Sequence, residues 1–494
     1  MKFKILILFL LYKTVLSLRI LSIFPSVTKS HYISCRRIIF ELLNRGHEVV
    51  VISPFKETQR NLTWIEVEVK SYFEAVPTLK DDLEVSFNFF TYHKYVWNTM
   101  NRYTEYIINK PKLMEFIQKD RSHFDLIFAH DFYQPIFYSF AYKYKAPIVL
   151  FSTFGISSHI NYFMGNALEI FQNPHEFSEA LKIESTFQKF RNLIYTIYSI
   201  YGRKYYVLDE QDKWSGMFGL DIPKLGVLER NVCMVFLNSH PSMNGVRSLL
   251  PNMVEIGGVH IEEVKPLNRD LQDFLDGATH GAILMSFGSF LDLSAQTDEF
   301  ISNILQVLGN LQQRVILKWN SKQNLTYDNM YTAEWLPQND ILAHKNMVLF
   351  ITHGGLLSSQ ESIYHGIPVL CIPFQATQPK ICRTGVELGY GLEIKEMTSQ
   401  NLEHSIKTLL SEQQFKDNAV EVSKSFRNRL VSPVDEAVYW LENSVNYYRN
   451  DKAFVCPFAE VILSVVVIYI LKNFFNKIEK KISIFKSIFL YRKI

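Results

Sequence analysis

The sequence contains few cysteines, and they form no pattern typical of a metal site or a disulfide scaffold. The five cysteines among the 494 residues are scattered and include no CxxC pair. Structural zinc sites and disulfide-rich domains use closely spaced, repeated cysteines. The sequence therefore indicates no metal site and leaves room for one disulfide at most.

Other features are absent as well. The formal net charge is +3, from 52 basic and 49 acidic residues, so the chain lacks the positive excess typical of nucleic-acid-binding proteins. No GxGxxG follows the first predicted strand, at Arg19 to Pro25, which argues against a dinucleotide-dependent oxidoreductase. The chain also shows no internal repeat and no low-complexity segment.

The order of predicted elements in the first half indicates a parallel α/β sheet. A strand at Arg19 to Pro25, a helix at 31–45 and a strand at Glu48 to Ser53 form a βαβ unit, with Gly46 placed to end the helix. Further strands at 125–129 and 147–151 continue the alternation. This pattern predicts a doubly wound sheet with helices on both faces.

A second α/β alternation begins at Ala282, and the length of the chain also favours two domains of roughly 200 residues each. Prolines and glycines crowd together between Pro241 and Pro266, which is typical of a connector. The predicted parts are a domain at 18–240, a connector at 241–275 and a domain at 276–450. In the second domain, strands are expected at 282–287, 315–319 and 348–351, and helices at 300–311 and 435–448.

Both ends of the chain resemble those of a membrane-anchored protein of the secretory pathway. Residues 1–17 combine a basic start, an apolar centre and small residues, as in a cleavable signal peptide. Residues 453–471 are nearly all apolar and would span about 28 Å as a helix, and residues 472–494 are rich in lysine and arginine. The positive-inside rule predicts a single-pass type I protein of the endoplasmic reticulum membrane with a lumenal body, and sequons at Asn61 and Asn324 fit a glycoprotein.

The most informative segment contains a strand, a glycine turn and a helix start. The apolar run Val348 to Ile351 ends at Thr352 and His353, passes through Gly354 and Gly355, and enters a serine-rich segment. Unpaired N–H groups and the positive end of the helix favour a phosphate or carboxylate at such a turn, and glycine lets the backbone come close to it. Three residues alone would mark only a turn.

The same segment carries groups suited to a nucleoside. Trp335 offers an indole face for a planar base, and Gln338 offers an amide for the polar edge of that base. Ser358 lies in the helix that follows the turn, and Glu361 can accept hydrogen bonds from a ribose diol. Together these groups predict a nucleotide site.

The ordered set of Trp, Pro, Gln, His, Gly-Gly, Ser, Glu, Pro and Gln within this segment resembles the signature of the UDP-glycosyltransferase family in its insect form. The resemblance covers nearly the whole chain. It implies the GT-B architecture, in which two Rossmann-like domains face each other across a cleft and a C-terminal helix crosses back to the first domain. It also implies inverting transfer of a hexose from a UDP-sugar, most simply UDP-glucose, to small lipophilic hydroxyl compounds, as in detoxification, without a metal or cofactor.

The resemblance assigns further roles. His353, the backbone after it and Ser289 would hold the diphosphate, and His31, in the loop after the first strand, would be the general base. The family's acidic partner of that histidine falls at His130, so Asp131, one position later, is the candidate partner. A shift of one residue reverses side-chain direction on a strand, and an incomplete pair therefore remains an alternative.

A second departure concerns the sugar. The family usually shows Asp-Gln in contact with the sugar hydroxyls, and this chain has Thr377-Gln378. Loss of an anionic hydrogen-bond acceptor weakens such a site by about a hundredfold. Two hypotheses follow: an active UDP-glycosyltransferase, or a catalytically impaired protein of the same fold that binds UDP or a lipophile. The aromatic stretches at 87–107 and 195–206 fit either an acceptor site or core packing.

Overall fold

The computed structural model describes residues 17–26, 28–67, 88–178, 180–288, 297–319, 327–374 and 377–450. Residues 1–16 of the predicted signal peptide, the apolar segment 453–471, the basic tail and the sequon at Asn324 lie outside these residues. Among the described residues, no helix combines the length and apolar character needed to cross a bilayer.

The first domain is built on a sheet of seven strands that are all parallel. In spatial order the strands are β3 (Leu62–Glu66), β2 (Glu48–Ser53), β1 (Arg19–Ile23), β4 (Leu126–His130), β5 (Ile148–Ser152), β6 (Met234–Leu237) and β7 (Met253–Glu255). Leu21 and Ile23 pack into one core and Ile20 into another, so both faces of β1 are buried. Apolar residues therefore run almost continuously along the central strands, as in other covered parallel sheets.

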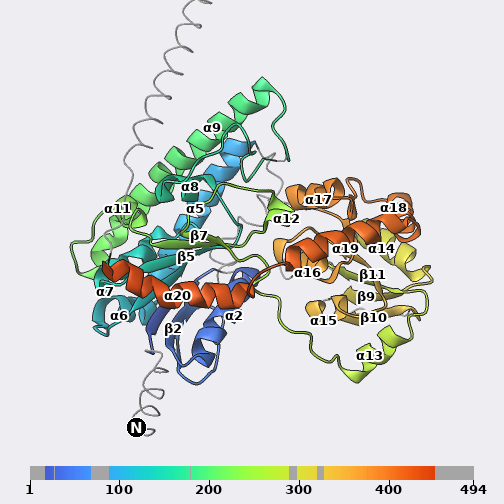
Figure 1. Cartoon of the computed structure of the whole chain (residues 1–494), viewed down its shortest axis with the longest axis horizontal. Coiled ribbons are helices and arrows are strands. Elements are labelled where there is room, and N and C mark those ends of the chain that lie inside the picture. The colour runs from blue at the N-terminus through green and yellow to red at the C-terminus, as the bar shows by residue number, and fades with distance from the viewer. Residues whose placement is uncertain are drawn as a thin grey trace, which may run out of the picture.

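Helices cover both faces of this sheet (Figure 1). They are α2 (Lys29–Asn44), α5 (Phe89–Ile108), α6 (Pro111–Lys119), η2 (Pro135–Tyr138), α7 (Ser139–Tyr144), α8 (Ser158–Met164), α9 (Thr186–Arg203), η3 (Lys204–Leu208), α10 (Asp209–Gln211), η4 (Asp212–Phe218) and α11 (Leu225–Glu229). Helix α2 ends at Asn44, with Arg45 as its C-cap, because Gly46 follows with a φ of 91°, a left-handed conformation that favours glycine. The predicted helix end is therefore confirmed.

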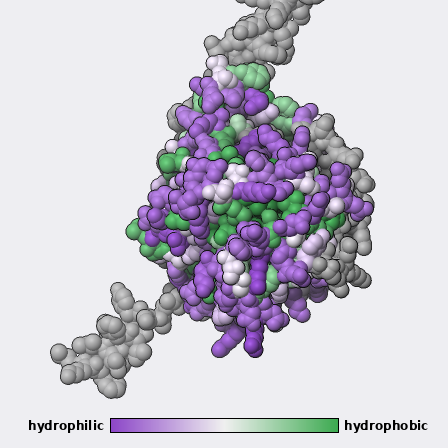
Figure 2. Space-filling view, turned by 90° about the vertical axis from the view of Figure 1, so that its right-hand side faces the viewer, coloured by the Kyte–Doolittle hydropathy of each residue, from purple (hydrophilic) through white to green (hydrophobic). Residues whose placement is uncertain are grey.

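The second domain repeats this arrangement with six parallel strands. The strands are, in spatial order, β10 (Met330–Ala333), β9 (Arg314–Lys318), β8 (Ala282–Ser286), β11 (Met347–Thr352), β12 (Val369–Cys371) and β13 (Gly391–Glu393). The helices are α13 (Arg269–Asp276), α14 (Asp298–Gly309), α15 (Gln338–Leu342), α16 (Leu356–His365), α17 (Gln378–Glu387), α18 (Ser399–Ser411) and α19 (Gln413–Arg427). Figure 2 faces the outer end of this domain, where hydrophilic side chains surround a smaller hydrophobic area.

The domain boundaries differ from those that the sequence predicts. Strand β7 completes the first sheet and α13 packs into the core of the second domain, so much of 241–275 is not a connector. Proline and glycine mark loops, and loops also occur inside domains. The short helix α12 (Pro241–Asn244) contributes Met243 to the core of the second domain.

The chain passes between the domains twice. After α19 it returns to the first domain as α20 (Pro433–Asn450), which packs against α2 and contributes Val434, Val438 and Leu441 to the core there. Figure 1 shows α20 extending from the side of the second domain across the first. Arg429, in the second connection, donates to the carbonyl oxygens of Glu255 and Gly257 at 3.0 Å each, so it ties the two connections together.

Both sheets have the strand order of a doubly wound nucleotide-binding fold. The order reverses between β1 and β4 in the first domain and between β8 and β11 in the second. Ligands of such sheets bind beyond the carboxyl ends of the strands at these reversals. The fold thus places the expected ligand sites beyond β1 and β4 and beyond β8 and β11.

Candidate active site

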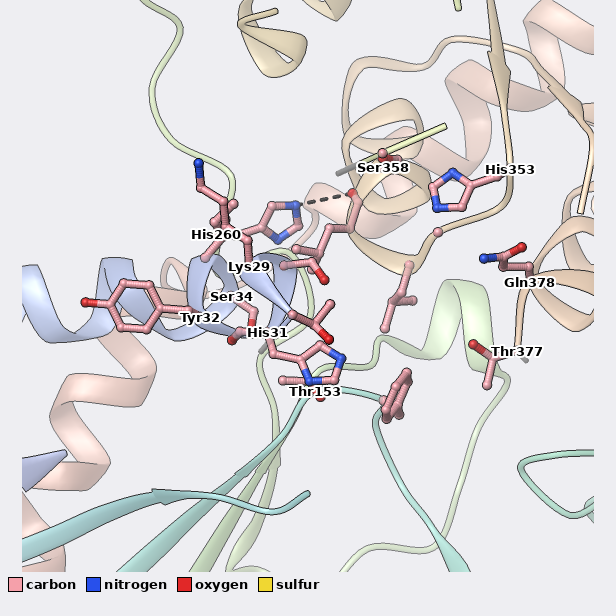
Figure 3. A pocket seen from close by; sticks show the side chains of 18 of the residues that line it. Lys29, His31, Tyr32, Ser34, Thr153, His260, His353, Ser358, Thr377 and Gln378 are labelled. Carbon is pink, nitrogen blue, oxygen red and sulfur yellow. Dashed lines mark hydrogen bonds between the residues drawn. The ribbon is translucent and has the colours of Figure 1, made fainter. Parts of the chain in front are cut away.

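A cavity of about 1520 Å³ lies between the domains and is lined by residues of both. The first domain contributes His31 and Thr153, and the second contributes Trp335, His353 and Gln378. Figure 3 shows His31 and Thr153 across this space from His353, Thr377 and Gln378. The residues that the sequence predicts for the base and for the donor therefore line one cleft.

His31 is the third residue of α2, which begins just after β1. Its ring meets Phe132 and Phe154 edge-on, with centroids 4.6 and 5.2 Å away, and its Nδ1 lies 3.3 Å from Ser26 Oγ. Burial lowers the pKa of His31 to about 4, since a charged imidazolium is poorly solvated there. The imidazole is therefore neutral at physiological pH and able to accept a proton.

The predicted pairing of His31 with Asp131 is wrong. Asp131 accepts a hydrogen bond from Tyr138 at 3.0 Å and lies 2.9 Å from Nε2 of His159. The backbone N–H of Asp131 still bonds to Phe151, so strand alternation continues, and Asp131 points to the face opposite His130. His130 is the residue that meets His31, with ring centroids 5.2 Å apart.

Asp131 instead belongs to a buried polar network. Burial by itself would raise the pKa of Asp131, but His159, the Arg203 guanidinium and the Tyr138 hydroxyl outweigh burial and lower that pKa to about 2. Arg203 in turn pairs with Glu229 at 2.6 Å, and both side chains are almost fully buried. These contacts hold the helices of the first domain together, and they leave Asp131 outside the cleft.

The glycine turn has the predicted strand, turn and helix. Gly354 has a φ of 79°, and a Cβ there would lie 2.5 Å from Cys382 Sγ. A Cβ on Gly355, the first residue before α16, would lie 2.6 Å from the His353 ring. No side chain caps α16, so its first N–H groups remain available to an anion. Larger residues would close this turn.

His353 lies beside a second positive group. Its pKa is lowered to about 4, first by burial and then by the charge of Lys318. Lys318 ends β9 and donates to the carbonyl oxygen of Gly288. Gly288 follows β8 and also lies against the His353 ring, whereas Ser289, the predicted diphosphate ligand after it, lies outside the described residues. Lys318 was not among the sequence candidates, although it lines the same cleft.

The predicted nucleoside residues lie together. Gln338 Nε2 donates to Glu361 Oε2 at 2.6 Å and to Ser358 Oγ at 3.0 Å. His260, which the sequence analysis missed, lies on the other side of Glu361. Its Nε2 is 3.2 Å from the Leu357 carbonyl oxygen and 3.5 Å from Glu361 Oε1. In the sequence, His260 is marked only by the two glycines shortly before it, Gly257 and Gly258, within the predicted connector.

The indole of Trp335 bridges the two domains. Trp335 is 57% exposed, and Nζ of Lys29 lies 4.1 Å from its ring centroid. Nζ of Lys318 lies 5.6 Å from the same centroid. The face that is predicted to stack on uracil therefore attracts two ammonium groups.

Thr377 and Gln378 lie at the start of α17. Gln378 Oε1 accepts the backbone N–H of Phe374 at 2.8 Å, which fixes the orientation of the amide. A disulfide between Cys371 and Cys382 joins the end of β12 to α17 directly beneath Gly354. Thus the one bridge for which the sequence leaves room supports the wall that carries Thr377 and Gln378.

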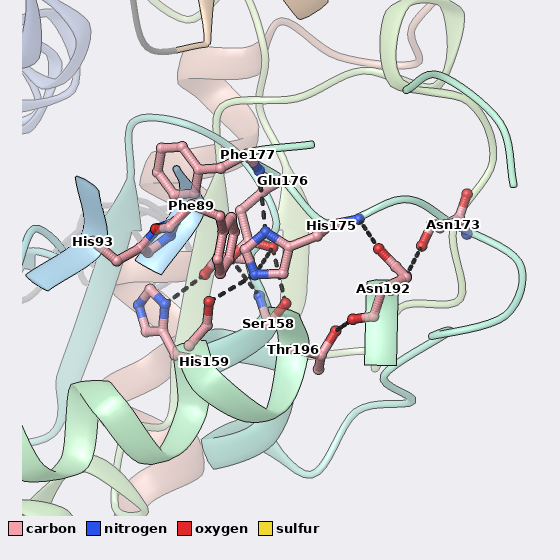
Figure 4. A network of polar contacts seen from close by, with 12 residues as sticks. Phe89, His93, Ser158, His159, Asn173, His175, Glu176, Phe177, Asn192 and Thr196 are labelled. Carbon is pink, nitrogen blue, oxygen red and sulfur yellow. Dashed lines mark hydrogen bonds and ion pairs between the residues drawn. The ribbon is translucent and has the colours of Figure 1, made fainter. Parts of the chain in front are cut away.

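The part of the cleft within the first domain is aromatic. Phe89 stacks on Tyr195 with centroids 3.7 Å apart, and Phe177 meets His93 edge-on at 4.9 Å. Figure 4 shows Phe89, His93 and Phe177 beside a polar network that includes His175. Nε2 of His175 lies 2.8 Å from Ser199 Oγ. Some rings of the aromatic stretches thus line the cleft and others, such as Trp97, are fully buried, while the acceptor site stays a prediction.

Among the described residues, no group of three or more His, Cys, Asp or Glu side chains is arranged to hold a metal ion. A family model described as "UDP-glucoronosyl and UDP-glucosyl transferase" matches residues 19–448. UDP-glycosyltransferase UGT4 of Dactylopius coccus is 31% identical over 436 residues, which cover 87% of this chain and 86% of that protein. The human UDP-glucuronosyltransferase 2B17 is 28% identical over 443 residues, covering 84% and 82% of the two chains.

Solved structures show the same fold. The glycosyltransferase VinC in complex with DTDP matches with a TM-score of 0.60 at 16% identity, over 87% of this chain and 100% of that chain. The calicheamicin glycosyltransferase CalG4 matches with a TM-score of 0.58 at 15% identity, over 87% and 99%. The two facing sheets are thus a GT-B fold. Given the family match over residues 19–448, the chain belongs to the UDP-glycosyltransferase family, whose members transfer a sugar from a UDP-sugar to an acceptor.

Proposed function

We propose that this enzyme transfers a hexosyl group, with glucose as the first candidate, to a hydroxyl of a small lipophilic acceptor with inversion at the anomeric carbon. The observation that carries the proposal is the placement of His31 and His353 on one cleft, each on a different domain. The aromatic lining near His31 suits a lipophilic acceptor.

His31 takes the acceptor proton on its cleft-facing nitrogen while the acceptor oxygen bonds to the anomeric carbon. The bond from that carbon to the β-phosphate oxygen breaks, and UDP leaves with the electron pair. The N–H groups at the start of α16, together with His353 and Lys318, are placed to stabilise the charge on UDP. Gln338, Ser358 and Glu361 fix the nucleoside, and Thr377 and Gln378 face the sugar.

A transfer assay with UDP-glucose and a panel of phenols tests this proposal through UDP release. The His31→Ala variant should lose about 100-fold or more in kcat, because a positioned base commonly contributes that much. Equal rates for the native enzyme and the variant would refute the role of His31. UDP binding without transfer to any acceptor would instead favour the alternative hypothesis, a catalytically impaired protein of the same fold that binds UDP or a lipophile.

The sugar preference has its own test. Thr377→Asp would place an anionic acceptor of hydroxyl hydrogens at the start of α17, and we expect a lower KM for UDP-glucose. If the native enzyme instead uses another UDP-sugar more efficiently than UDP-glucose, the hydroxyl of Thr377 selects a different hexose.

We also propose that the protein is located in the endoplasmic reticulum with its body in the lumen, a cleaved signal peptide and a membrane anchor at 453–471. The Cys371–Cys382 disulfide supports an oxidising compartment, and Asn61, in the first sequon, is exposed. Protease protection in sealed microsomes, combined with removal of N-glycans, tests the topology. Digestion of the whole chain in intact vesicles would contradict it.

A further inference from the structure

His31 needs a partner that the predicted carboxylate does not provide. A histidine that accepts a proton through one nitrogen must carry its hydrogen on the other, and a hydrogen bond usually fixes that choice. Asp131 points to the opposite face of the sheet, toward Tyr138 and His159. Among the described residues, Ser26 is the only side chain that hydrogen-bonds to the His31 ring.

Ser26 lies where an orienting group is required. It follows β1, is 2% exposed, and places its Oγ 3.3 Å from His31 Nδ1. The same Oγ accepts the backbone N–H of Thr28 at 3.2 Å, so the hydroxyl is held in the turn between β1 and α2. One lone pair of Oγ meets Thr28, and the other is available to a hydrogen on Nδ1.

The surroundings of His31 restrict its ring in other ways. Phe132 and Phe154 meet the ring almost perpendicularly, at 88° and 89°, and therefore limit its rotation. His130, from the end of β4, is the titratable group in contact with the ring, and its pKa is held well below the usual range by burial and by His31. Lys29, two residues before His31, directs its ammonium to Trp335. No carboxylate faces the ring among the described residues.

We infer that Ser26 is the positioning residue for His31, with Nδ1–H donating to Ser26 Oγ and Nε2 left free to take the acceptor proton. The inference rests on the proposed role of His31 as the base. Ser26 replaces a charged partner with a neutral one, so it fixes the tautomer and does not stabilise the imidazolium by charge. The low pKa of His31 agrees with this, and it favours acidic acceptors such as phenols over aliphatic alcohols.

The test uses the full chain with UDP-glucose and a phenol, measured from pH 4 to pH 9. Ser26→Ala should lower kcat about 10-fold, as expected for the loss of one orienting hydrogen bond, while KM for UDP-glucose changes little. Ser26→Thr, which keeps the hydroxyl, should recover most of this loss. Ser26→Asp should move the acid limb of kcat/KM upward by about 1 to 2 pH units, because a nearby carboxylate favours the charged imidazole.

Controls separate this inference from the proposed function. Ser22→Ala removes a fully buried serine of β1, whose hydroxyl has no hydrogen-bond partner among the described residues, and should leave the pH profile as it is. If His31→Ala matches the native rate, the proposed function fails. If His31→Ala is inactive but Ser26→Ala keeps the native kcat and acid limb, only the role of Ser26 is overturned. Thermal unfolding and UDP binding check that each variant is folded.

Discussion

The ammonium of Lys29, on the first domain, lies 4.1 Å from the centre of the Trp335 ring, on the second. The ammonium therefore occupies one face of the indole that is predicted to receive uracil. A nucleotide whose base stacks on that face must displace Lys29 from it. The released ammonium is then free to approach the diphosphate.

This arrangement predicts opposite effects of Lys29→Met on two ligands. Uridine should bind about 2- to 5-fold more tightly, because the base no longer competes with a cation. UDP should bind about 5- to 10-fold less tightly, because a charge near the diphosphate is lost. Calorimetry with both ligands measures the difference, and Lys112→Met, on an exposed residue of α6, serves as control. Parallel changes for the two ligands would contradict this account.

The carboxylate of Glu361 gives a second prediction. Glu361→Gln should lower UDP affinity by about 10- to 100-fold, because hydrogen bonds to a charged acceptor are strong. The loss should shrink with 2′-deoxy-UDP if Glu361 binds the ribose diol. Glu403→Gln, on the exposed face of α18, provides a matched control. An equal loss with both nucleotides would place Glu361 elsewhere.

Buried neutral histidines predict how stability depends on pH. Burial lowers the pKa values of His31, His175 and His353 to about 4, below the ordinary histidine value of 6.5. Between those values the unfolded chain binds more protons than the folded one, so stability falls as pH decreases from 6.5 toward 4. Each such histidine contributes about 1.4 kcal/mol per pH unit in that window.

Thermal unfolding at pH 7, 6 and 5 checks this prediction. The decrease should be smaller in His175→Gln, because one of the titrating groups has been removed. His175 lies in the first domain and has no proposed role in the transfer reaction, so its replacement tests stability alone. A Tm that stays constant from pH 7 to pH 5 would show that these imidazoles are charged, or solvated, in the folded state.

The Cys371–Cys382 disulfide gives a fourth prediction. The replacement of both cysteines by alanine should lower the free energy of unfolding by about 2 to 3 kcal/mol, the usual effect of a short disulfide loop. KM for the UDP-sugar should rise as well, since Thr377 and Gln378 lie within that loop. Cys233→Ala, at a free half-buried cysteine, is the control. A stability loss without a change in KM would limit the bridge to a role in folding.

Much of the fold could be predicted because local pattern and tertiary packing agree. The strand at Glu48 to Ser53 and the glycine turn after His353 are confirmed, since buried parallel strands leave apolar runs and tight turns leave glycines. Strand β7 was missed because its three residues, Met253–Glu255, are too short to show a pattern. The boundaries failed for that reason.

The candidate site could be predicted only where the motif fixes the geometry. Gln338, Ser358 and Glu361 lie together because α15, strand β11 and the glycine turn bring the start of α15 against α16. The partner of His31 depends on which face of β4 each residue occupies. Because strand pairing extends one residue further, to Asp131, the Asp131 side chain points away from His31. Ser26 and His260 carry no pattern in the sequence, because their contacts arise only from the packing of loops.

The return of the chain through α20 makes the second domain an insertion within the first. Any opening of the cleft must bend two tethers at once, and Arg429 fastens one tether to the other. A domain held by two joined connections is expected to rotate about the axis that passes through them, and rotation about other axes is restricted. Donor loading and product escape should therefore follow a single arc of motion.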